Sequence, residues 1–461
     1  MSHQQFEKRQ QLPVSAADAF AWHERPGALE RLIPPWEKVE LVRKVGEGVR
    51  TGTRVTLKNR FGPFQLTWEA EHREYVPGRL FRDVALRGPF AYWDHRHEFT
   101  DTGEGECLLR DSVEYELPGG MVGRMIAGGL VRRKMAALFR YRQSVTHDDL
   151  AFFQSHSSRT PLRILVSGAS GFVGRALCPF LTTQGHEVLH LVRRAPRSAS
   201  EAYWDWEKGE IDLSKLGQID AVVHLAGAGI ADARWTEARR RVIRDSRVVG
   251  TRLLAEALAR LPSPPRVVVG GSAIGYYGSQ GDAMLDESTG LGNGFLAEVG
   301  AAWEGAWEPL SQRNVRLVYL RTGVVLSPQG GALAKLLPAF RFGVGGPVGH
   351  GRHWWSWISM DDVLGAIGHA LENGQVSGPL NAVAPEPVTS AEFARVLGCV
   401  LGRPAFLPAP AWALRMALGP MVDEVLLASQ RVRPAKLIGT GYKFRHSTLE
   451  SALRHLLGCD Y

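Results

Sequence analysis

The chain has 461 residues, a length typical of two or three domains rather than one. Hydrophobic residues make up 44% of it and charged residues 22%, a composition that excludes a wholly disordered protein. The formal net charge of +8 suits anionic ligands such as nucleotide phosphates, but the positive charge is scattered, so a dedicated nucleic-acid binder is not expected.

Cysteine usage and hydropathy indicate the compartment. The four cysteines lie far apart, without a C-x-x-C pair or a Cys/His grouping at zinc spacing, so neither a disulfide scaffold nor a metal site is predicted. The amino-terminal residues are polar, unlike a secretory signal, and no run of about 18 apolar residues could span a membrane. We therefore expect a cytoplasmic protein without a membrane span.

Residues 1–154 have the pattern of an antiparallel sheet closed by one long helix. A first strand is expected over 6–14 and short helices over 16–32, followed by six extended runs separated by Gly and Pro residues. The closing helix is predicted over 121–145, where Val122, Ile126 and Leu130 recur every four residues. These positions define an apolar face able to lie against the sheet.

This order of elements resembles the START-like helix-grip fold of polyketide cyclases and lipid-transfer proteins. The resemblance rests on the pattern of elements and includes no diagnostic motif. In that fold the helix and the sheet enclose an apolar cavity, so the resemblance implies a hydrophobic ligand. The alternative is that the same aromatic and methionine side chains simply fill a core.

A polar stretch ending in proline, residues 155–161, is predicted to be a linker. Beyond it strands and helices alternate, which indicates a parallel sheet with helices on both faces. We expect a Rossmann domain with substrate-side insertions over 162–405 and a helical segment of the substrate lobe over 406–461. The predicted fold class is therefore an α/β Rossmann fold preceded by an α+β START-like domain.

The most informative segment, GASGFVG, lies between a short apolar strand and a helix. In such a βαβ unit the first glycine allows a sharp turn, the second a close approach to a pyrophosphate, and the third close packing of helix on strand. The helix amino terminus offers N–H groups and a positive dipole to the phosphates. The predicted cofactor-binding residues of this loop are Gly168, Ser170, Gly171, Phe172, Val173 and Gly174.

The end of the next strand, expected over 187–192, indicates which dinucleotide is bound. An acidic residue there would bind the ribose hydroxyls of NAD, but Arg193 and Arg194 follow the strand instead. A guanidinium in this place can pair with the 2′-phosphate of NADP, so NADP(H) is favoured over NAD(H). The alternative is that both arginines face solvent.

Further motifs resemble those of the epimerase-like atypical short-chain dehydrogenases, a branch described as nucleoside-diphosphate-sugar epimerases. They include HLAGAGI, GSAIGYYG, LRTGVVLSPQGGALAKLLPAF and GHGRHWWSWISMDDV, within about residues 163–461. The resemblance implies that Leu225, Ala226 and Gly227 lie along the adenosine and ribose of the cofactor, and that Ser272 is the active-site serine.

One part of the superfamily's catalytic pattern is missing from this chain. The superfamily uses a tyrosine as general acid/base and a lysine four residues later, which lowers the pKa of the phenol. In the expected window, residues 293–308, the aligned pair is Phe295 and Val299, and neither side chain can transfer a proton. The standard mechanism is therefore not available.

Other side chains are candidates for the remaining roles. Tyr276 could replace the missing acid, whereas Tyr277 matches a structural Tyr-Gly pair, and Arg321 ends a strand where the chain would pass the nicotinamide. By resemblance, Arg352 could hold an anionic substrate, and Asp361 is expected to cap a helix that opens at the next residue.

The leading prediction is an NADP(H)-dependent oxidoreductase or epimerase-like enzyme acting on a small-molecule substrate, with Ser272 and Tyr276 as its catalytic residues. Two alternatives remain: a non-catalytic NADP(H)-binding sensor module, and a hydrophobic-ligand carrier that works through the amino-terminal domain. The sequence leaves the substrate and the oligomeric state open, a homodimer included.

Overall fold

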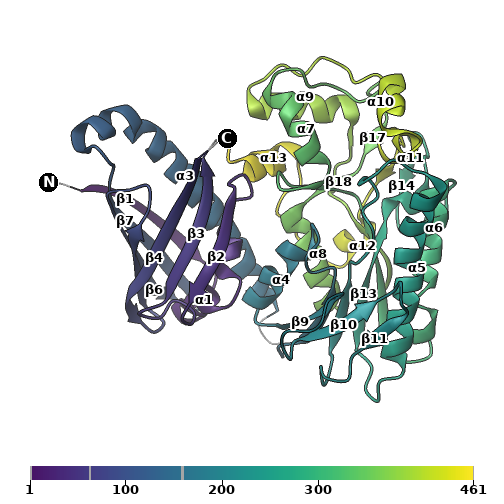
Figure 1. The fold of residues 1–461 in the computed structure, drawn as a ribbon, viewed down its shortest axis with the longest axis horizontal. Coiled ribbons are helices and arrows are strands. Elements are labelled where there is room, and N and C mark those ends of the chain that lie inside the picture. The colour runs from purple at the N-terminus through teal and green to yellow at the C-terminus, as the bar shows by residue number, and fades with distance from the viewer. Residues whose placement is uncertain (1–2, 62–63, 157–159, 460–461) are drawn as a thin grey trace. The chain divides into compact units, whose positions relative to one another are not determined.

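The computed structural model describes residues 3–61, 64–156 and 160–459, and the chain forms two compact units. One unit consists mainly of the residues up to 160 and the other mainly of those from 161 onward. Figure 1 labels the elements of both units. Within the expected linker, residues 157–159 lie outside the described residues.

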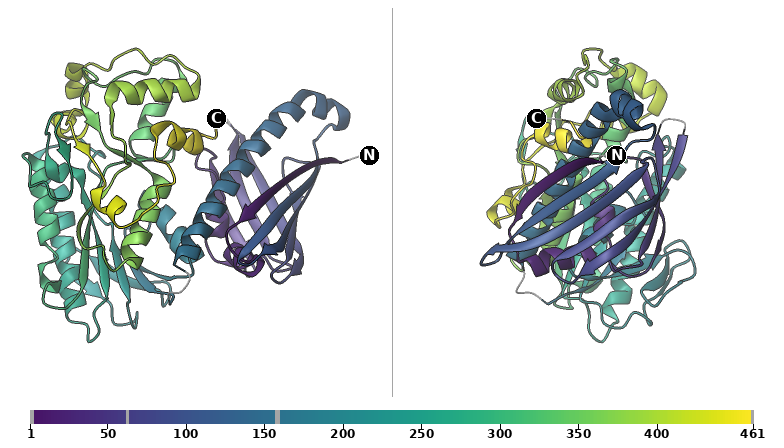
Figure 2. Two further views of the ribbon diagram at one scale, coloured as in Figure 1. Left: turned by 180° about the vertical axis from the view of Figure 1, so that it is seen from behind. Right: turned by 90° about the vertical axis from the view of Figure 1, so that its left-hand side faces the viewer.

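The first unit is a seven-stranded antiparallel sheet with a long helix along one face (Figure 2). The strand order is β1-β7-β6-β5-β4-β3-β2, so the first strand pairs with the last. The strands are β1 (Gln4–Leu12), β2 (Val39–Val45), β3 (Arg54–Phe61), β4 (Phe64–Val76), β5 (Leu80–Arg87), β6 (Tyr92–Gly103) and β7 (Glu106–Glu116). The helices are α1 (Ala16–Glu24), α2 (Ala28–Arg31) and α3 (Gly120–Ser155). This arrangement confirms the helix-grip fold class.

Alternate residues of the central strands form the core of this unit. In β6 the buried side chains are those of Trp93, His95, His97 and Phe99, at every second position, and β7 alternates in the same way. Apolar rings occupy the two ends of this row, whereas imidazoles occupy its middle. The inner face of the sheet is therefore not uniformly hydrophobic.

Helix α3 is longer than predicted, and its first half does not pack as expected. Met135 and Phe139 are buried, but Val122 and Ile126 are 65% and 81% exposed. A 36-residue helix is about 54 Å long, whereas strands of 11 to 13 residues reach only about 40 Å. The prediction was right for the second half of the helix and wrong for the first, because the helix extends beyond the sheet (Figure 1).

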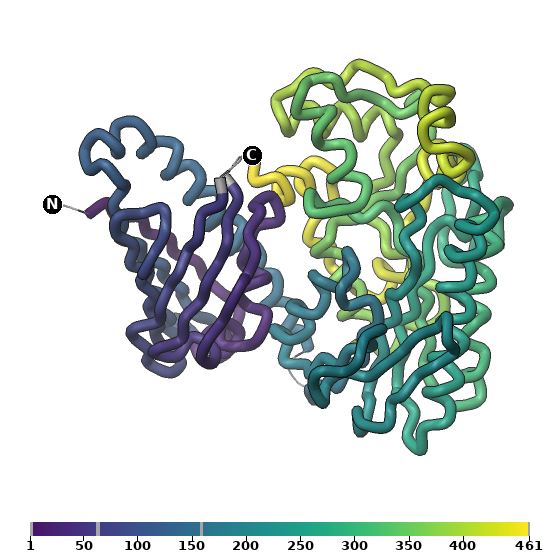
Figure 3. The backbone as a smooth tube through the Cα atoms, in the orientation of Figure 1, coloured from purple at the N-terminus to yellow at the C-terminus, as the bar shows by residue number. Residues whose placement is uncertain are grey.

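The second unit is an eight-stranded sheet between helices (Figure 3). The strand order is β11-β10-β9-β8-β12-β13-β15-β19, and all pairs are parallel except β10–β11. The strands are β8 (Arg163–Ser167), β9 (Glu187–Val192), β10 (Glu201–Asp205), β11 (Glu210–Asp212), β12 (Ala221–His224), β13 (Val267–Ala273), β15 (Arg316–Thr322) and β19 (Gly378–Ala382). Helices α5 (Glu237–Ala259) and α6 (Phe295–Gly305) cover one face, and α4 (Gly174–Thr183) and α8 (Met360–Glu372) cover the other. The predicted Rossmann class is confirmed.

Shorter elements form a lobe of the same unit around a core of leucine, phenylalanine and tryptophan side chains. Its helices are α7 (Gly331–Arg341), α9 (Ser390–Leu401), α10 (Ala411–Leu418), α11 (Met421–Val425), α12 (Ala435–Gly439) and α13 (Leu449–Leu457). Its short strands are β14 (Met284–Leu285), β16 (Val324–Leu326), β17 (Trp354–Trp355), β18 (Trp357–Ser359), β20 (Val388–Thr389) and β21 (Arg431–Val432), and 3-10 turns occupy Ile274–Tyr277 and Glu308–Leu310. In the described part of the chain, no helix is both long enough and apolar enough to cross a membrane.

Candidate cofactor and substrate site

The carboxyl ends of β8, β12, β13 and β15 meet at one edge of the parallel sheet, which is where ligands bind in open α/β folds. The register places Ser167 beside His224 and Ser272 beside Arg321. Four connections leave the sheet at this edge, directly after Ser167, His224, Ala273 and Thr322. Most of the predicted site residues belong to these connections or to the strand ends beneath them.

Two glycines of the loop after β8 are required by its geometry. Gly168 has a φ of 72°, in the left-handed region, and a Cβ there would lie 2.9 Å from the backbone nitrogen of Ala226. At Gly174 a Cβ would overlap the carbonyl oxygen of Gly168, so no larger residue fits where α4 begins. The sharp turn and the close packing are those expected of the first and third glycines.

The amino terminus of α4 can receive an anion. Within the described residues, the backbone N–H groups of Phe172 and Val173 meet no backbone acceptor, and the first turn of α4 carries no acidic side chain. The ring of Phe172 packs against Gly330 and Gly331, where added Cβ atoms would lie 2.6 and 3.1 Å from it. The side chain thus anchors the loop, while the N–H groups and the helix dipole suit a phosphate.

The two arginines after β9 differ in what they contact. Arg194 forms a bidentate ion pair with Glu201, with N–O distances of 2.6 and 2.8 Å, and this contact lowers the pKa of Glu201 to about 2. Arg193 is exposed, and no other described side chain pairs with it. Arg194 therefore holds the loop, and Arg193 is the cation that remains available to a 2′-phosphate.

The loop after β12 is anchored from beneath. The hydroxyl of Ser167 accepts the N–H groups of Leu225 and Ala226 at 3.2 and 3.3 Å. Arg247 lies against Gly227, where an added Cβ would be 3.2 Å from the guanidinium carbon, and burial lowers the pKa of Arg247 to about 10. The loop therefore offers a fixed backbone surface, and its contact with adenosine stays a prediction.

His224, at the end of β12, is fully buried beside this loop. Its Nδ1 lies 2.7 Å from the hydroxyl of Ser167, and its Nε2 lies 3.0 Å from the hydroxyl of Thr251. Burial lowers the pKa of His224 to about 3, so the ring is neutral at physiological pH. Both ring nitrogens have partners, and His224 braces the strand end.

Ser272, the predicted active-site serine, belongs to a buried network. Its hydroxyl donates to Oε1 of Glu304 at 2.7 Å, and Arg321 holds the same carboxylate through Nε and Nη2, each at 2.8 Å. The side chains of Arg321 and Glu304 are only 4% and 11% exposed. Burial acts against the charge of Arg321, but the bonds to Glu304 raise its pKa above the usual value. The Ser272 hydroxyl and the Arg321 guanidinium are thus both engaged by Glu304, and the cofactor-binding role expected for Arg321 stays a prediction.

Two tyrosines lie against the same arginine. Arg321 Nη1 donates to the hydroxyl of Tyr277 at 3.1 Å, which donates to Oδ1 of Asn381 at 2.8 Å, and burial raises the pKa of Tyr277. The ring of Tyr276 is half-buried, and the guanidinium of Arg321 lies 3.5 Å from its centroid. No hydrogen bond to the Tyr276 hydroxyl is found among the described residues, and its catalytic role stays a prediction.

Phe295 and Val299, the pair expected from the sequence where the superfamily has tyrosine and lysine, stand in α6. The ring of Phe295 packs edge-on against Trp235, with centroids 5.2 Å apart, and Val299 is buried. The guanidinium of Arg240 lies over the rings of both Trp235 and Phe295. Phe295 is thus held by aromatic and cation–π contacts, and Val299 by burial.

The predicted substrate-side segment is divided between surface and core. Arg352 is exposed, as the binding of an anion requires. Ser359 caps helix α8, because its hydroxyl accepts the N–H of Asp362 at 3.0 Å. The cap expected at Asp361 is wrong, because this residue lies inside the helix, where its carboxylate is buried 3.2 Å from His455.

Glu304 and Asn381 are network residues that sequence reasoning missed. The helix FLAEVGAAWEG contains two glutamates, and its sequence does not distinguish them. In the structure Glu298 is exposed, whereas Glu304 accepts a hydrogen bond from Ser272 of strand β13. For Asn381, the available signal was a polar residue within a strand that is otherwise apolar.

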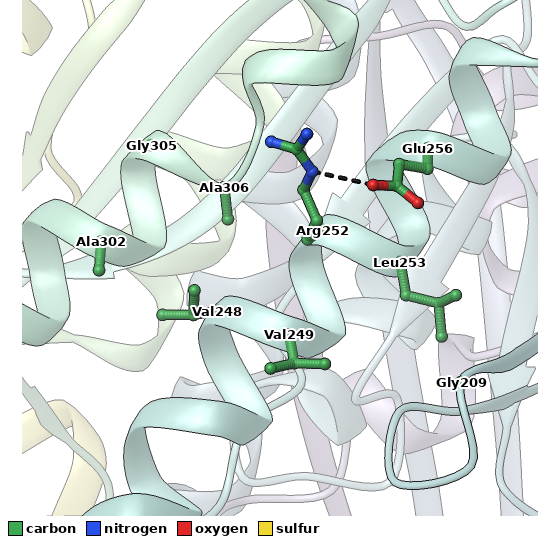
Figure 4. Close-up of a pocket in the computed structure, with 9 residues that line it drawn as sticks. All are labelled: Gly209, Val248, Val249, Arg252, Leu253, Glu256, Ala302, Gly305 and Ala306. Carbon is green, nitrogen blue, oxygen red and sulfur yellow. Dashed lines mark hydrogen bonds and ion pairs between the residues drawn. The ribbon is translucent and has the colours of Figure 1, made fainter.

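A groove of about 480 Å³ lies between α5 and α6 (Figure 4). Aliphatic side chains line it, together with the ion pair of Arg252 and Glu256, whose nitrogen and oxygen are 2.9 Å apart. Neither the glycine loop nor the network around Glu304 contributes to its lining. The groove is therefore separate from the candidate site.

Comparison with known proteins adds three family matches. Residues 164–382 match the NAD dependent epimerase/dehydratase family, residues 12–139 match polyketide cyclase / dehydrase and lipid transport, and residues 409–456 match a domain of unknown function. An epimerase family protein of Mycobacterium bovis is 42% identical over 290 residues, which cover 63% of this chain and 96% of the relative.

Two solved structures extend the similarity. A nucleoside-diphosphate sugar epimerase from Corynebacterium glutamicum is 33% identical with a TM-score of 0.80, and the match covers 98% of this chain and 90% of that one. Human epimerase family protein SDR39U1, solved with NADPH, is 36% identical with a TM-score of 0.60, and the match covers 64% and 99% of the two chains. Both units of the chain thus have structural counterparts in the Corynebacterium protein.

Proposed function

Because the chain belongs to the NAD dependent epimerase/dehydratase family, we propose that it uses NADP(H) in an oxidoreductase or epimerase-like reaction on a small-molecule substrate. The observation that carries the proposal is the combination of a glycine loop too crowded for any side chain at Gly174 with an exposed cation at Arg193 that pairs with no other described side chain. The human relative solved with NADPH supports the choice of NADP(H) over NAD(H).

The residues of the candidate site fit such a cofactor. The N–H groups of the loop from Gly168 to Gly174 would hold the diphosphate, Arg193 the 2′-phosphate, and the backbone of residues 225–227 the adenosine. When bound, the cofactor supplies or accepts a hydride. The exposed guanidinium of Arg352 would hold an anionic group of the substrate.

In this proposal Tyr276 is the residue that transfers a proton to or from the substrate. Its hydroxyl is not engaged by another described residue, and the guanidinium over its ring fixes the position of the ring. Glu304 orients that guanidinium, and Ser272 donates to Glu304. Ser272, Glu304 and Arg321 together therefore position the ring of Tyr276. Ser272 is accordingly a positioning residue in this proposal rather than the group that polarises the substrate.

Titration of the full chain with NADPH and NADH by calorimetry tests the cofactor. We expect NADPH to bind more tightly, and Arg193→Glu to lower its affinity at least about tenfold, because a charge-assisted pair contributes about 1.5–3 kcal/mol. NADH affinity should not change. Arg194→Gln is the matched control and should have the smaller effect, since Arg194 already pairs with Glu201. Binding of neither dinucleotide at millimolar concentration would overturn the proposal.

A second candidate function, a non-catalytic NADP(H)-binding module, is favoured by the hydrophobic packing at Phe295 and Val299. Oxidation of NADPH across a broad carbonyl panel separates the two functions. In an enzyme, Tyr276→Phe should abolish turnover while NADPH affinity stays the same. Tight binding with no oxidation of NADPH by the wild type would favour the binding module. The third alternative, a carrier of hydrophobic ligands, fits less well, because imidazoles occupy the middle of the inner face of the first unit.

A further inference from the structure

Four ionisable side chains meet inside the first unit: Asp83 of β5, His95 and His97 of β6, and Asp111 of β7. The strand register places Asp83 opposite His95 and His97 opposite Asp111. The two histidines and Asp111 are at most 11% exposed at their side chains, and Asp83 is 17% exposed. The core of a START-like sheet thus contains a compact cluster of imidazoles and carboxylates.

Asp111 contacts both histidines from one side of the cluster. Its Oδ1 lies 3.1 Å from Nε2 of His95 and 2.7 Å from Nδ1 of His97. An ionised carboxylate only accepts hydrogen bonds, so Nε2 of His95, which is hydrogen-bonded to Asp111, carries a proton. In a neutral ring this assigns the lone pair of His95 to Nδ1.

Nδ1 of His95 and Nε2 of His97 both face the carboxylate of Asp83. Its Oδ1 lies 3.7 Å from Nδ1 of His95 and 3.8 Å from Nε2 of His97. Such separations exceed a hydrogen bond, but they approach the spacing of about 3.4 Å between ligand atoms bound to tetrahedral Zn²⁺ at about 2.0–2.1 Å. Oδ1 of Asp83 and Nδ1 of His95 are both acceptors, and acceptors that converge in a core need a cation or a proton between them.

The carboxylates of the cluster also favour a cation at this place. Asp83 and Asp111 each lie within 4 Å of ring nitrogens of both histidines, so two acidic groups surround the imidazoles. The competing arrangement is a proton on His97, whose pKa Asp111 raises against the effect of burial. Arg142 of α3 also acts on both carboxylates, and His23 and His72 face the cluster.

We propose that Asp83, His95 and His97 bind one divalent transition-metal ion such as Zn²⁺, with Asp111 as the outer carboxylate that orients the imidazole of His95 and lies next to that of His97. Three protein ligands leave a coordination position for water or an exogenous ligand. Cysteine and histidine spacing predicted no metal site, because these ligands lie on two strands and include no cysteine. The site is independent of the proposed function of the second unit.

Metal titration of the full chain, stripped with EDTA, tests this site. We expect one equivalent of Zn²⁺ to bind, and Co²⁺ to give the visible absorption of a tetrahedral site. Asp83→Asn and His97→Gln remove ligands and should lower Zn²⁺ affinity more than the roughly 10- to 100-fold expected for Asp111→Asn, which removes only the outer partner. Arg96→Gln is the matched control, because Arg96 lies between the two histidines and pairs with Glu74 and Glu98. It should bind metal as the wild type does.

Two checks keep the result unambiguous. Thermal unfolding in EDTA verifies that each variant is folded. A second cluster, Asp361, His446 and His455, also contains possible ligands, so the site is assigned by the difference between Asp83→Asn and the wild type. The proposal is overturned if the wild type binds no Zn²⁺, or if Asp83→Asn and His97→Gln, when folded, bind as much as Arg96→Gln.

Discussion

A buried carboxylate meets only donors in the second unit, whereas one in the first unit faces a ring nitrogen that is itself an acceptor. Glu304 accepts hydrogen bonds from the hydroxyl of Ser272 and from two N–H groups of Arg321. Asp83 faces ring nitrogens of His95 and His97 at 3.7 and 3.8 Å, while the other nitrogen of His95 already donates to Asp111 at 3.1 Å.

The difference separates two uses of buried polar groups. A network in which every acceptor has its donor is complete without a ligand, so it stiffens the structure around it. A cluster whose acceptors converge without a donor is complete only with a proton or a cation. Burial and polarity are similar in the two places, and the count of donors distinguishes them.

The largest expected loss of stability follows from breaking the network of Ser272, Glu304 and Arg321, in which every acceptor has its donor. Glu304→Gln leaves the buried guanidinium of Arg321 without its counter-charge, which we expect to cost about 3–5 kcal/mol of the unfolding free energy of the second unit. Urea unfolding measures this loss. Glu256→Gln removes a partner from an exposed pair with Arg252 and should cost less than about 1 kcal/mol. Equal losses in the two variants would contradict the role of Glu304.

The next largest effect is a pH dependence of the unfolding free energy that His224 causes. Both ring nitrogens of His224 contact hydroxyls. Its folded pKa of about 3 is below the usual 6.5, so its stabilisation is present above pH 6.5 and is lost as the pH falls toward 3. Between pH 6.5 and 5 the wild type should lose about 2 kcal/mol more than His224→Gln does. Unfolding free energies measured across this range check the sign, and parallel curves for the two proteins would refute it.

A smaller effect is expected from removing one donor of the complete network. Ser272→Ala leaves Glu304 with both bonds from Arg321, so we expect a loss of about 1–2 kcal/mol in unfolding free energy. NADPH affinity should change little. Complete loss of turnover in a stably folded Ser272→Ala variant would instead show that the hydroxyl acts on the substrate.

The smallest change in stability is expected when a carboxylate is replaced by an amide in the cluster around His95 and His97, where Asp83 accepts no hydrogen bond from another described residue. In EDTA and at alkaline pH, where the imidazoles are neutral, Asp83→Asn replaces an acceptor by an amide that can donate to a ring nitrogen. We expect the unfolding free energy to change by less than about 1 kcal/mol. A loss as large as that of Glu304→Gln would mean that Asp83 already has a donor.

Much of the fold could be predicted from local patterns. Strand β9 occupies the expected residues 187–192, and Gly168 and Gly174 have the conformation and crowding that the motif requires. Helix α3 shows the limit of periodicity, since Val122 and Ile126 continue the apolar repeat into turns that are exposed. A repeat indicates which face of a helix is apolar, but not whether a sheet lies opposite to it.

The sequence by itself determined the glycine turn between β8 and α4 and the two-unit organisation, because turns, periodicity and short motifs depend on neighbours along the chain. The tertiary structure alone decided that Glu304 rather than Glu298 meets Arg321, and that Asp83 meets His95 and His97. These partners are distant in sequence, and strand pairing with helix packing brings their side chains together. The balance of donors and acceptors that results is a property of the folded core.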